Sequence, residues 1–164
     1  MERKRAVLVV YSLSWVGIGA MLLAIAAAPV LEPRFPRWSG FIYGIFAPFC
    51  HQIPERCFRL AGHPLAVCAR CLGVYLGFAA GLVLYPIVRG TRDLRPPSLR
   101  LFLLISTPTA ADVAGNVLGL WTSSPWLRFG LATAWGTLLP FFFITGLVDA
   151  MTQIRRGDRR SNGP

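Results

Sequence analysis

Four long apolar stretches constrain the fold of this chain more than any other feature. They cover about residues 6–28, 65–88, 100–121 and 126–148. A helix needs about 20 residues to cross a hydrocarbon core of about 30 Å, so each stretch is long enough to span a bilayer. Only 15% of the residues are charged, against about 25% in soluble domains. The sequence therefore predicts an all-α integral membrane protein, a four-helix transmembrane bundle that forms one domain over residues 1–164.

Two apolar segments need separate interpretation. The stretch from Trp38 to Phe49 is too short to cross a bilayer, so we interpret it as an interfacial or re-entrant segment. The first long stretch follows the charged residues 2–5 and ends in an alanine run, which a signal peptide could also show. Its apolar run is longer than the roughly 7–15 residues of a signal peptide, so we predict a retained helix.

The basic residues are distributed by topology. Of the 17, the three at positions 3–5, the four at 89, 92, 95 and 100, and the four at 155, 156, 159 and 160 would share one side of the membrane. The positive-inside rule makes that side cytoplasmic. We therefore predict a multi-pass protein of the plasma (inner) membrane with both termini inside and a disordered basic tail over about 155–164. The net charge of +10 is then explained by the orientation of the chain in the lipid bilayer, its predicted partner. It gives no support to nucleic-acid binding.

Two spans carry features that predict packing or function. The second span has the repeated G-x-x-x-G pattern of Gly73, Gly77 and Gly81, which allows close approach of another helix, in this chain, in a second copy or in a membrane partner. The third span contains Asp112, with Asn116 one turn later on the same face. A carboxylate at depth should face the bundle and have a partner, so it is either a structural hydrogen-bonding group or part of a transport path.

All four cysteines and both histidines fall within residues 50–71, which form the predicted Cys/His loop. C-x-x-C can ligate one metal ion from a single turn, and an earlier Cys-His pair can complete a tetrahedron. Zinc fits this ligand type first, with copper or iron also open. The predicted ligands are Cys50, His51, Cys68 and Cys71, with Cys57 or His63 as substitutes, and the predicted supporting residues are Gln52, Arg56, Arg70, Tyr75, Asp112 and Asn116.

Two other interpretations of the loop stay open. Cys68 and Cys71 at a helix start could form a catalytic dithiol, because the helix dipole and Arg70 favour a thiolate there. Four spans with C-x-x-C at one membrane edge are similar in outline to quinone-linked thiol oxidoreductases, which would make a quinone the cofactor. Alternatively, disulfides could simply staple an extracytoplasmic loop. No phosphate-binding loop, nucleophile elbow or pair of catalytic carboxylates supports a kinase or hydrolase.

The loop also resembles a family of small bacterial and archaeal membrane proteins known as a domain of unknown function. The resemblance rests on Cys50-His51-Gln52-Ile53-Pro54-Glu55-Arg56-Cys57-Phe58, on Gly62 and Pro64, and on Cys68-Ala69-Arg70-Cys71-Leu72-Gly73-Val74-Tyr75-Leu76-Gly77. With the span of Asp112 and the segment Trp126-Leu127-Arg128, it covers about residues 40–148. Val113 stands where the family has Gly, and Cys57 stands where it has Ser. The resemblance implies a core set of Cys50, His51, Cys68 and Cys71, and implies no particular activity.

Overall fold

The computed structural model describes residues 2–88 and 98–161 as five α-helices, one 3-10 turn and a two-stranded hairpin. The predicted basic positions 89, 92 and 95 and the last residues of the predicted tail, 162–164, lie outside this described part. The elements are α1 (Glu2–Leu31), α2 (Pro36–Phe46), η1 (Pro54–Arg56), β1 (Arg59–Leu60), β2 (His63–Pro64), α3 (Ala69–Val88), α4 (Leu99–Val117) and α5 (Pro125–Ser161).

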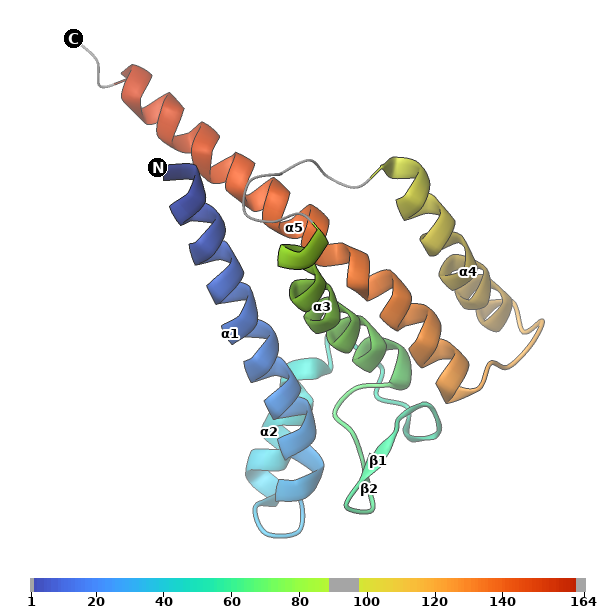
Figure 1. Ribbon diagram of the computed structural model, residues 1–164. Coiled ribbons are helices and arrows are strands. Elements are labelled where there is room, and N and C mark those ends of the chain that lie inside the picture. The colour runs from blue at the N-terminus through green and yellow to red at the C-terminus, as the bar shows by residue number, and fades with distance from the viewer. Residues whose placement is uncertain (1, 89–97, 162–164) are drawn as a thin grey trace.

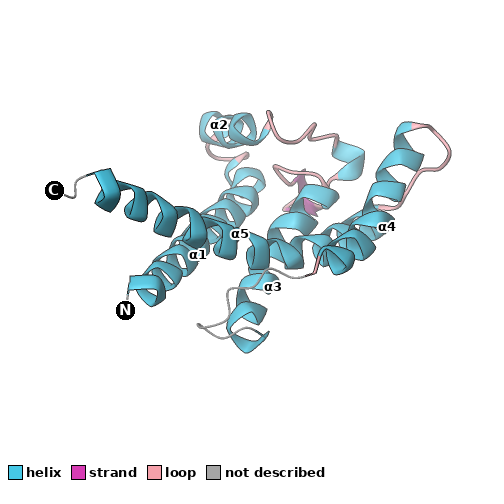
Figure 2. Cartoon of the chain, turned by 90° about the horizontal axis from the view of Figure 1, so that it is seen from above, coloured by secondary structure: helices cyan, strands magenta, loops and turns pink. Residues whose placement is uncertain are grey.

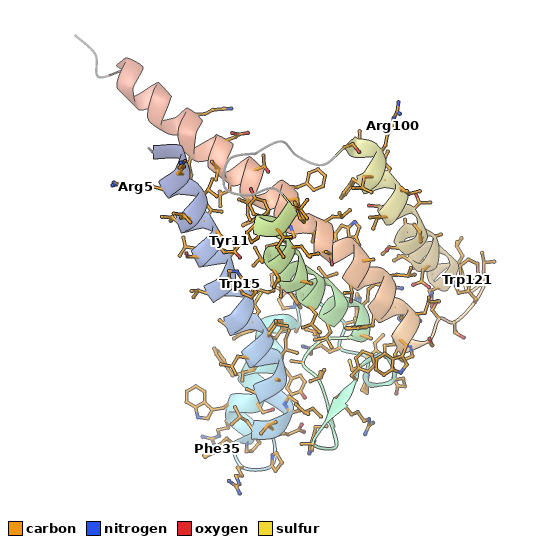
Figure 3. All side chains as sticks on the ribbon, in the orientation of Figure 1. Arg5, Tyr11, Trp15, Phe35, Arg100 and Trp121 are labelled. Atoms are coloured by element: carbon orange, nitrogen blue, oxygen red, sulfur yellow. The ribbon has the colours of Figure 1, made fainter. Side chains whose placement is uncertain are left out.

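The helices are arranged around the pair α3 and α5. Figures 1 and 2 show α1 and α4 on opposite sides of this pair. Both chain ends lie at one end of the molecule, while α2 and the β1–β2 hairpin lie at the other (Figure 1). Arg5 and Arg100 are near the end with the termini, and Phe35 is near the opposite end (Figure 3). The Cys/His loop is therefore separated from the termini by the length of the helices.

The glycine stripe of α3 packs directly against α5. A Cβ on Gly77 would lie 2.3 Å from the backbone oxygen of Thr133, and one on Gly81 would lie 2.3 Å from that of Thr137. Gly136 of α5 makes the reciprocal contact, because its Cβ would lie 2.5 Å from the backbone oxygen of Val74. The predicted close approach is confirmed, but it is to a helix of the same chain. The stripe is therefore covered by α5, which corrects the prediction that a second copy or a membrane partner could pack on it.

Two buried apolar clusters hold the remaining elements. One joins α1 to α3 and α5 and includes Ile18, Leu82 and Ile144. The other joins the end of α1 to α2 and to the segment before α3, and includes Ile25 and Phe46. Cys50, Ala66 and Val67 belong to the second cluster, so the start of α3 is fixed against α1 and α2.

Within the described residues, three helices are long and apolar enough to cross a membrane. They are Lys4–Leu31, Ala69–Val88 and Pro125–Met151, with mean hydropathies of 2.1, 2.0 and 1.7. The third predicted span corresponds to α4, which is a helix of 19 residues but is not among the three. Its polar residues, including Arg100, Asp112 and Asn116, lower its hydropathy. The helical class is confirmed, and a fourth span stays a prediction.

Three other segments can be compared with the sequence-based boundaries. The short apolar stretch before the loop forms α2, which has only 11 residues. The loop contains a tight hairpin, because Ala61 and Gly62 both have positive φ, at 52° and 86°. α5 continues through Ser161, where an unstructured tail was predicted from about residue 155. Arginines favour helical backbone, so a basic segment can extend a helix that is already formed.

Candidate metal centre

Two helix boundaries position the cysteines. The chain turns at the end of α2, where the N–H of Cys50 donates to the carbonyl of Phe46 over 3.0 Å. Cys68 immediately precedes α3, and its carbonyl accepts from the N–H of Leu72 over 2.9 Å, as at the start of a helix. Cys71 then lies in the first turn of α3. The end of α2 and the beginning of α3 therefore meet at the sulfur atoms.

Cys50, Cys68 and Cys71 form a compact cluster. Their Sγ atoms all lie within 4.8 Å of one another, and those of Cys68 and Cys71 are 3.6 Å apart. A disulfide bond would bring two sulfurs to about 2.05 Å. A tetrahedral zinc ion with Zn–S bonds of about 2.3 Å would place them about 3.8 Å apart. The thiols are free in the structure, at a separation that a shared metal ion would also give.

Two backbone N–H groups point at the sulfur of Cys50. The N–H of Cys68 lies 3.2 Å from this Sγ, and that of Gln52 lies 3.5 Å away. Gln52 reaches this position with a φ of 52°, which is rare for a residue other than glycine. N–H donors of this kind stabilise negative charge on a sulfur ligand.

The side chain of Gln52 holds the loop together. Its Nε2 donates to the carbonyl oxygens of Tyr43 and Ala66, each over 2.8 Å. It thereby links α2 to the segment just before the C-x-x-C pair. The sequence predicted Gln52 as a supporting residue, and the structure shows its side chain bonded to the backbone on both flanks of the cluster.

The other sulfur and imidazole groups lie outside the cluster. His51 is exposed and lines the adjacent pocket, but it is not among the grouped ligand atoms of the described residues. Adjacent residues in extended chain point in opposite directions, which accounts for the separation of His51 from Cys50. Cys57 is buried, and its Sγ donates to the carbonyl of Ile53 over 3.2 Å. His63 is paired through Nδ1 with the carboxylate of Glu32 at 2.9 Å.

The thiols of the loop have opposite electrostatic surroundings. Hydrogen bonds with the thiols of Cys50 and Cys71 lower the pKa of Cys68 well below its usual range, so that sulfur is the favoured thiolate of the cluster. Burial, together with the negative charge of Cys68, raises the pKa of Cys57 to about 12. Cys57 is therefore a neutral thiol with a structural contact, while Cys68 is a strong candidate ligand.

A buried polar network lies next to the cluster. Asp112 of α4 pairs with the guanidinium of Arg70 and accepts a hydrogen bond from the hydroxyl of Ser123. Asn116 donates to Asp112 over 3.2 Å and accepts at Oδ1 from Arg128 over 2.5 Å. The network joins α3, α4 and α5 beside the cysteines. Ser123 and Arg128 were not predicted as site residues, although Arg128 is a charge near the start of an apolar span, which is a signal of function or pairing.

A pocket of about 200 Å³ opens over the cluster and the network. Its lining includes the three clustered cysteines, His51 and three arginines. Tyr75 is not part of this lining; it packs against Phe46, with ring centroids 6.3 Å apart, beneath the cluster. The predicted residues that share the pocket are Cys50, His51, Gln52, Arg56, Cys68, Arg70 and Cys71.

Residues 50–142 match the family described as "Predicted membrane protein (DUF2085)". The chain belongs to this family. The match begins at Cys50 and includes the three clustered cysteines, the polar network and most of the apolar part of α5. Membership confirms the predicted resemblance and the membrane class.

Two curated relatives support this assignment. An uncharacterised protein of Methanocaldococcus jannaschii is 33% identical over 103 residues, which cover 63% of this chain and 66% of the relative, just under two thirds of its length. An uncharacterised protein of Methanothermobacter thermautotrophicus is 38% identical over 84 residues, which cover 51% of this chain and 74% of the relative. No solved structure matches the chain.

Proposed function

We propose that this DUF2085 protein is a four-span membrane protein that binds a divalent metal ion, zinc in the first place, at Cys50, Cys68 and Cys71. The observation that carries the proposal is the grouping of the three Sγ atoms within 4.8 Å, from two segments that are 18 residues apart. Three protein ligands and one open position are typical of zinc sites that accept water or an external ligand. The pocket over the cysteines provides access to that position.

His51 is the proposed fourth protein ligand or a group that contacts whatever occupies the open position. It lines the pocket, so a change of side-chain rotamer could bring its imidazole toward the cysteines. Three thiolates and one divalent cation carry a net charge of −1. Arg70 and Arg56 in the same lining would balance that charge.

The proposed orientation places the metal site at the outer face. Arg5 and Arg100 lie at the same end of the molecule as both termini (Figure 3). The end of α2 and the start of α3, which carry the clustered cysteines, lie toward the other end (Figure 1). This distribution supports cytoplasmic termini under the positive-inside rule. It also supports α4 as the fourth span, because α4 lies alongside α5, with Arg100 at the end that holds the termini (Figure 3).

A thiol–disulfide oxidoreductase is the second candidate. The lowered pKa of Cys68 at the start of a C-x-x-C helix favours it, because the thiolate is the reactive form. Closing a disulfide between the Cys68 thiolate and the Cys71 thiol would release two electrons and one proton. A membrane quinone would accept these, together with one proton from water, to become a quinol. A transporter with Asp112 in its path gains no such support, since Asp112 is already held by Arg70, Ser123 and Asn116.

Elemental analysis of detergent-purified protein, combined with thiol counting, tests the proposal. We expect about one metal ion per chain, lost from the Cys50→Ser, Cys68→Ser and Cys71→Ser variants. Cys57→Ser is the matched control, because Cys57 lies in the same loop but outside the cluster, and it should keep the metal. Metal-free protein with a Cys68–Cys71 disulfide would overturn the metal site, and turnover of a quinone or a thiol substrate would then distinguish an oxidoreductase from a structural disulfide.

A further inference from the structure

Three arginines from three different elements line the pocket over the cysteines. Arg56 comes from η1, Arg70 from the first turn of α3, and Arg128 from the first turn of α5. The described residues that line the pocket include no aspartate or glutamate. The pocket therefore combines three thiols with three positive charges.

Arg128 has hydrogen-bonding capacity that the described residues do not use. Its side chain is buried, with 6% of the residue exposed, and its Nε has no hydrogen-bond partner within the described part of the chain. It donates from a terminal nitrogen to the side chain of Asn116, which is a neutral amide. A buried guanidinium without an anion is costly, because both its charge and its N–H groups lose water.

Asp112 attracts Arg128 but offsets its charge only in part, while Arg56 and Arg70 repel it. Asp112 is the carboxylate of the network, and it is paired with Arg70. Three arginines and one aspartate leave a charge of +2 around the pocket. A metal ion with three thiolates would reduce this to +1, which still calls for an anion.

We propose that this pocket binds a phosphate-type oxyanion through Arg128, Arg56 and Arg70. Guanidinium groups bind such oxygens through paired N–H donors, which explains why arginine would be used at all three positions. A pocket of about 200 Å³ is large enough, since one water occupies about 30 Å³ of the liquid. The proposal rests on the proposed metal site in one respect: the metal neutralises thiolates that would otherwise repel the anion.

The oxyanion could be free phosphate or the phosphate of a lipid headgroup. Phe49, which is 77% exposed, also lines the pocket and provides an apolar contact for a lipid at its mouth. Both sources offer the same tetrahedral group to the arginines. They differ in the acyl chains, so an experiment with two arms can separate them.

The first arm is calorimetric titration of metal-loaded protein in a neutral detergent with inorganic phosphate. The second arm is native mass spectrometry after exchange into phosphatidylglycerol or, for comparison, phosphatidylcholine. Binding in the first arm identifies a free anion, and selective retention of phosphatidylglycerol identifies a headgroup; either result supports the proposal. Metal-loaded protein that binds neither would overturn it.

Variants connect the binding to the arginines. Arg128→Met should weaken binding at least tenfold. Arg59→Met is the control, because Arg59 belongs to the Cys/His loop but does not line the pocket, and it should bind as wild type. If Arg128→Met does not fold, Arg56→Met replaces it, because Arg56 is exposed and its loss should weaken binding several-fold without unfolding. Wild-type affinity in the folded variants would contradict the assignment.

Metal content separates this proposal from the previous one. Arg128→Met should keep the metal ion, since Arg128 is neither a proposed ligand nor one of the arginines that would balance the charge of the metal site. Wild-type protein that carries metal but binds no phosphate group would refute the anion site alone. Wild-type protein without metal would refute the metal site, whatever the outcome of the titration.

Discussion

Arg70 and Asp112 form an ion pair that joins the first turn of α3 to α4 across 42 residues of sequence. The carboxylate is 5% exposed and the guanidinium 27% exposed. Arg70 is also one of the two residues between Cys68 and Cys71. The pair therefore connects the packing of α4 directly to the turn that carries the proposed metal ligands.

Replacing Asp112 with asparagine should destabilise this connection. The variant leaves Arg70 without its carboxylate, and removing one partner of a buried pair costs about 3–5 kcal/mol. We expect the free energy of unfolding to fall by about 3 kcal/mol, the lower end of this range, since the guanidinium keeps access to the pocket. Thermal unfolding in detergent should show a lower midpoint for Asp112→Asn. Glu55→Gln is the control, because it removes an exposed carboxylate of the Cys/His loop, and it should melt as wild type.

Adding a methyl group to Gly77 should separate α3 from α5. A Cβ there would lie 2.3 Å from the backbone oxygen of Thr133, and backbone cannot move aside as a flexible side chain can. Overpacking costs about 1–3 kcal/mol, and a backbone contact places Gly77→Ala at the upper end. Gly17→Ala is the control, since no atom lies within 4 Å of its added Cβ. Equal melting temperatures for the two variants would contradict the close helix contact.

The sequence identified the residues that make close contacts or could react, but it did not identify the residues that they contact. Gly73, Gly77 and Gly81 reveal a close contact through their spacing alone, but spacing cannot say which helix makes it. Cys68 and Cys71 are neighbours on one helical turn, so their proximity is local. The pairing of Arg70 with Asp112 depends on how α4 docks, which no local pattern specifies.

His51 and Arg128 also show that the sequence does not specify which residues meet in space. His51 was grouped with Cys50 because the two are adjacent, yet neighbouring side chains diverge and the imidazole lies outside the sulfur cluster. Arg128 was noted only as part of a family segment, yet folding brings it to the pocket beside Arg70. Sequence distance is thus a poor guide to spatial distance in this loop and its surroundings.

Cys57 should be alkylated only at unusually high pH. Burial, followed by the negative charge of Cys68, raises its pKa to about 12, and only the thiolate reacts. An ordinary thiol with a pKa of about 8.5 reaches its full rate slightly above that pH. The rate for Cys57 should instead rise about tenfold per pH unit until it nears about pH 12. Peptide mass spectrometry after timed iodoacetamide treatment measures this rate.

The raised pKa of Cys57 also makes the free energy of unfolding depend on pH. Because the folded-state pKa of Cys57 is above the unfolded value, its contribution to stability is present below about pH 8.5 and is lost as the pH rises through about 12. Cys57→Ser should remove this alkaline dependence, because it removes the thiol that ionises. The serine hydroxyl can still donate to the carbonyl of Ile53 as the thiol does. A Cys57 rate that levels off near pH 9 would show that the thiol is not buried in solution.

Gln52→Glu should weaken metal binding without removing a ligand. The carboxylate has no N–H to donate to Tyr43 and Ala66, so its charge would face two carbonyl oxygens that now accept from Nε2 over 2.8 Å. Residues that orient metal ligands typically contribute about 10–100-fold in metal affinity. Competition with a chromophoric chelator should show a loss of that size for Gln52→Glu. Gln153→Glu makes the same charge change on an exposed position of α5 and should leave the affinity unchanged.

A second substitution distinguishes the contribution of the Gln52 side chain to metal binding from that of its backbone N–H. Glycine accepts a φ of 52° without strain, so Gln52→Gly should keep the N–H directed at Cys50 Sγ while it removes both side-chain bonds. If the side-chain bonds fix the flanks of the cluster, Gln52→Gly should lose metal affinity nearly as strongly as Gln52→Glu. If Gln52→Gly instead binds metal as wild type, the backbone donor alone orients Cys50, and the contacts to Tyr43 and Ala66 serve only the packing of α2.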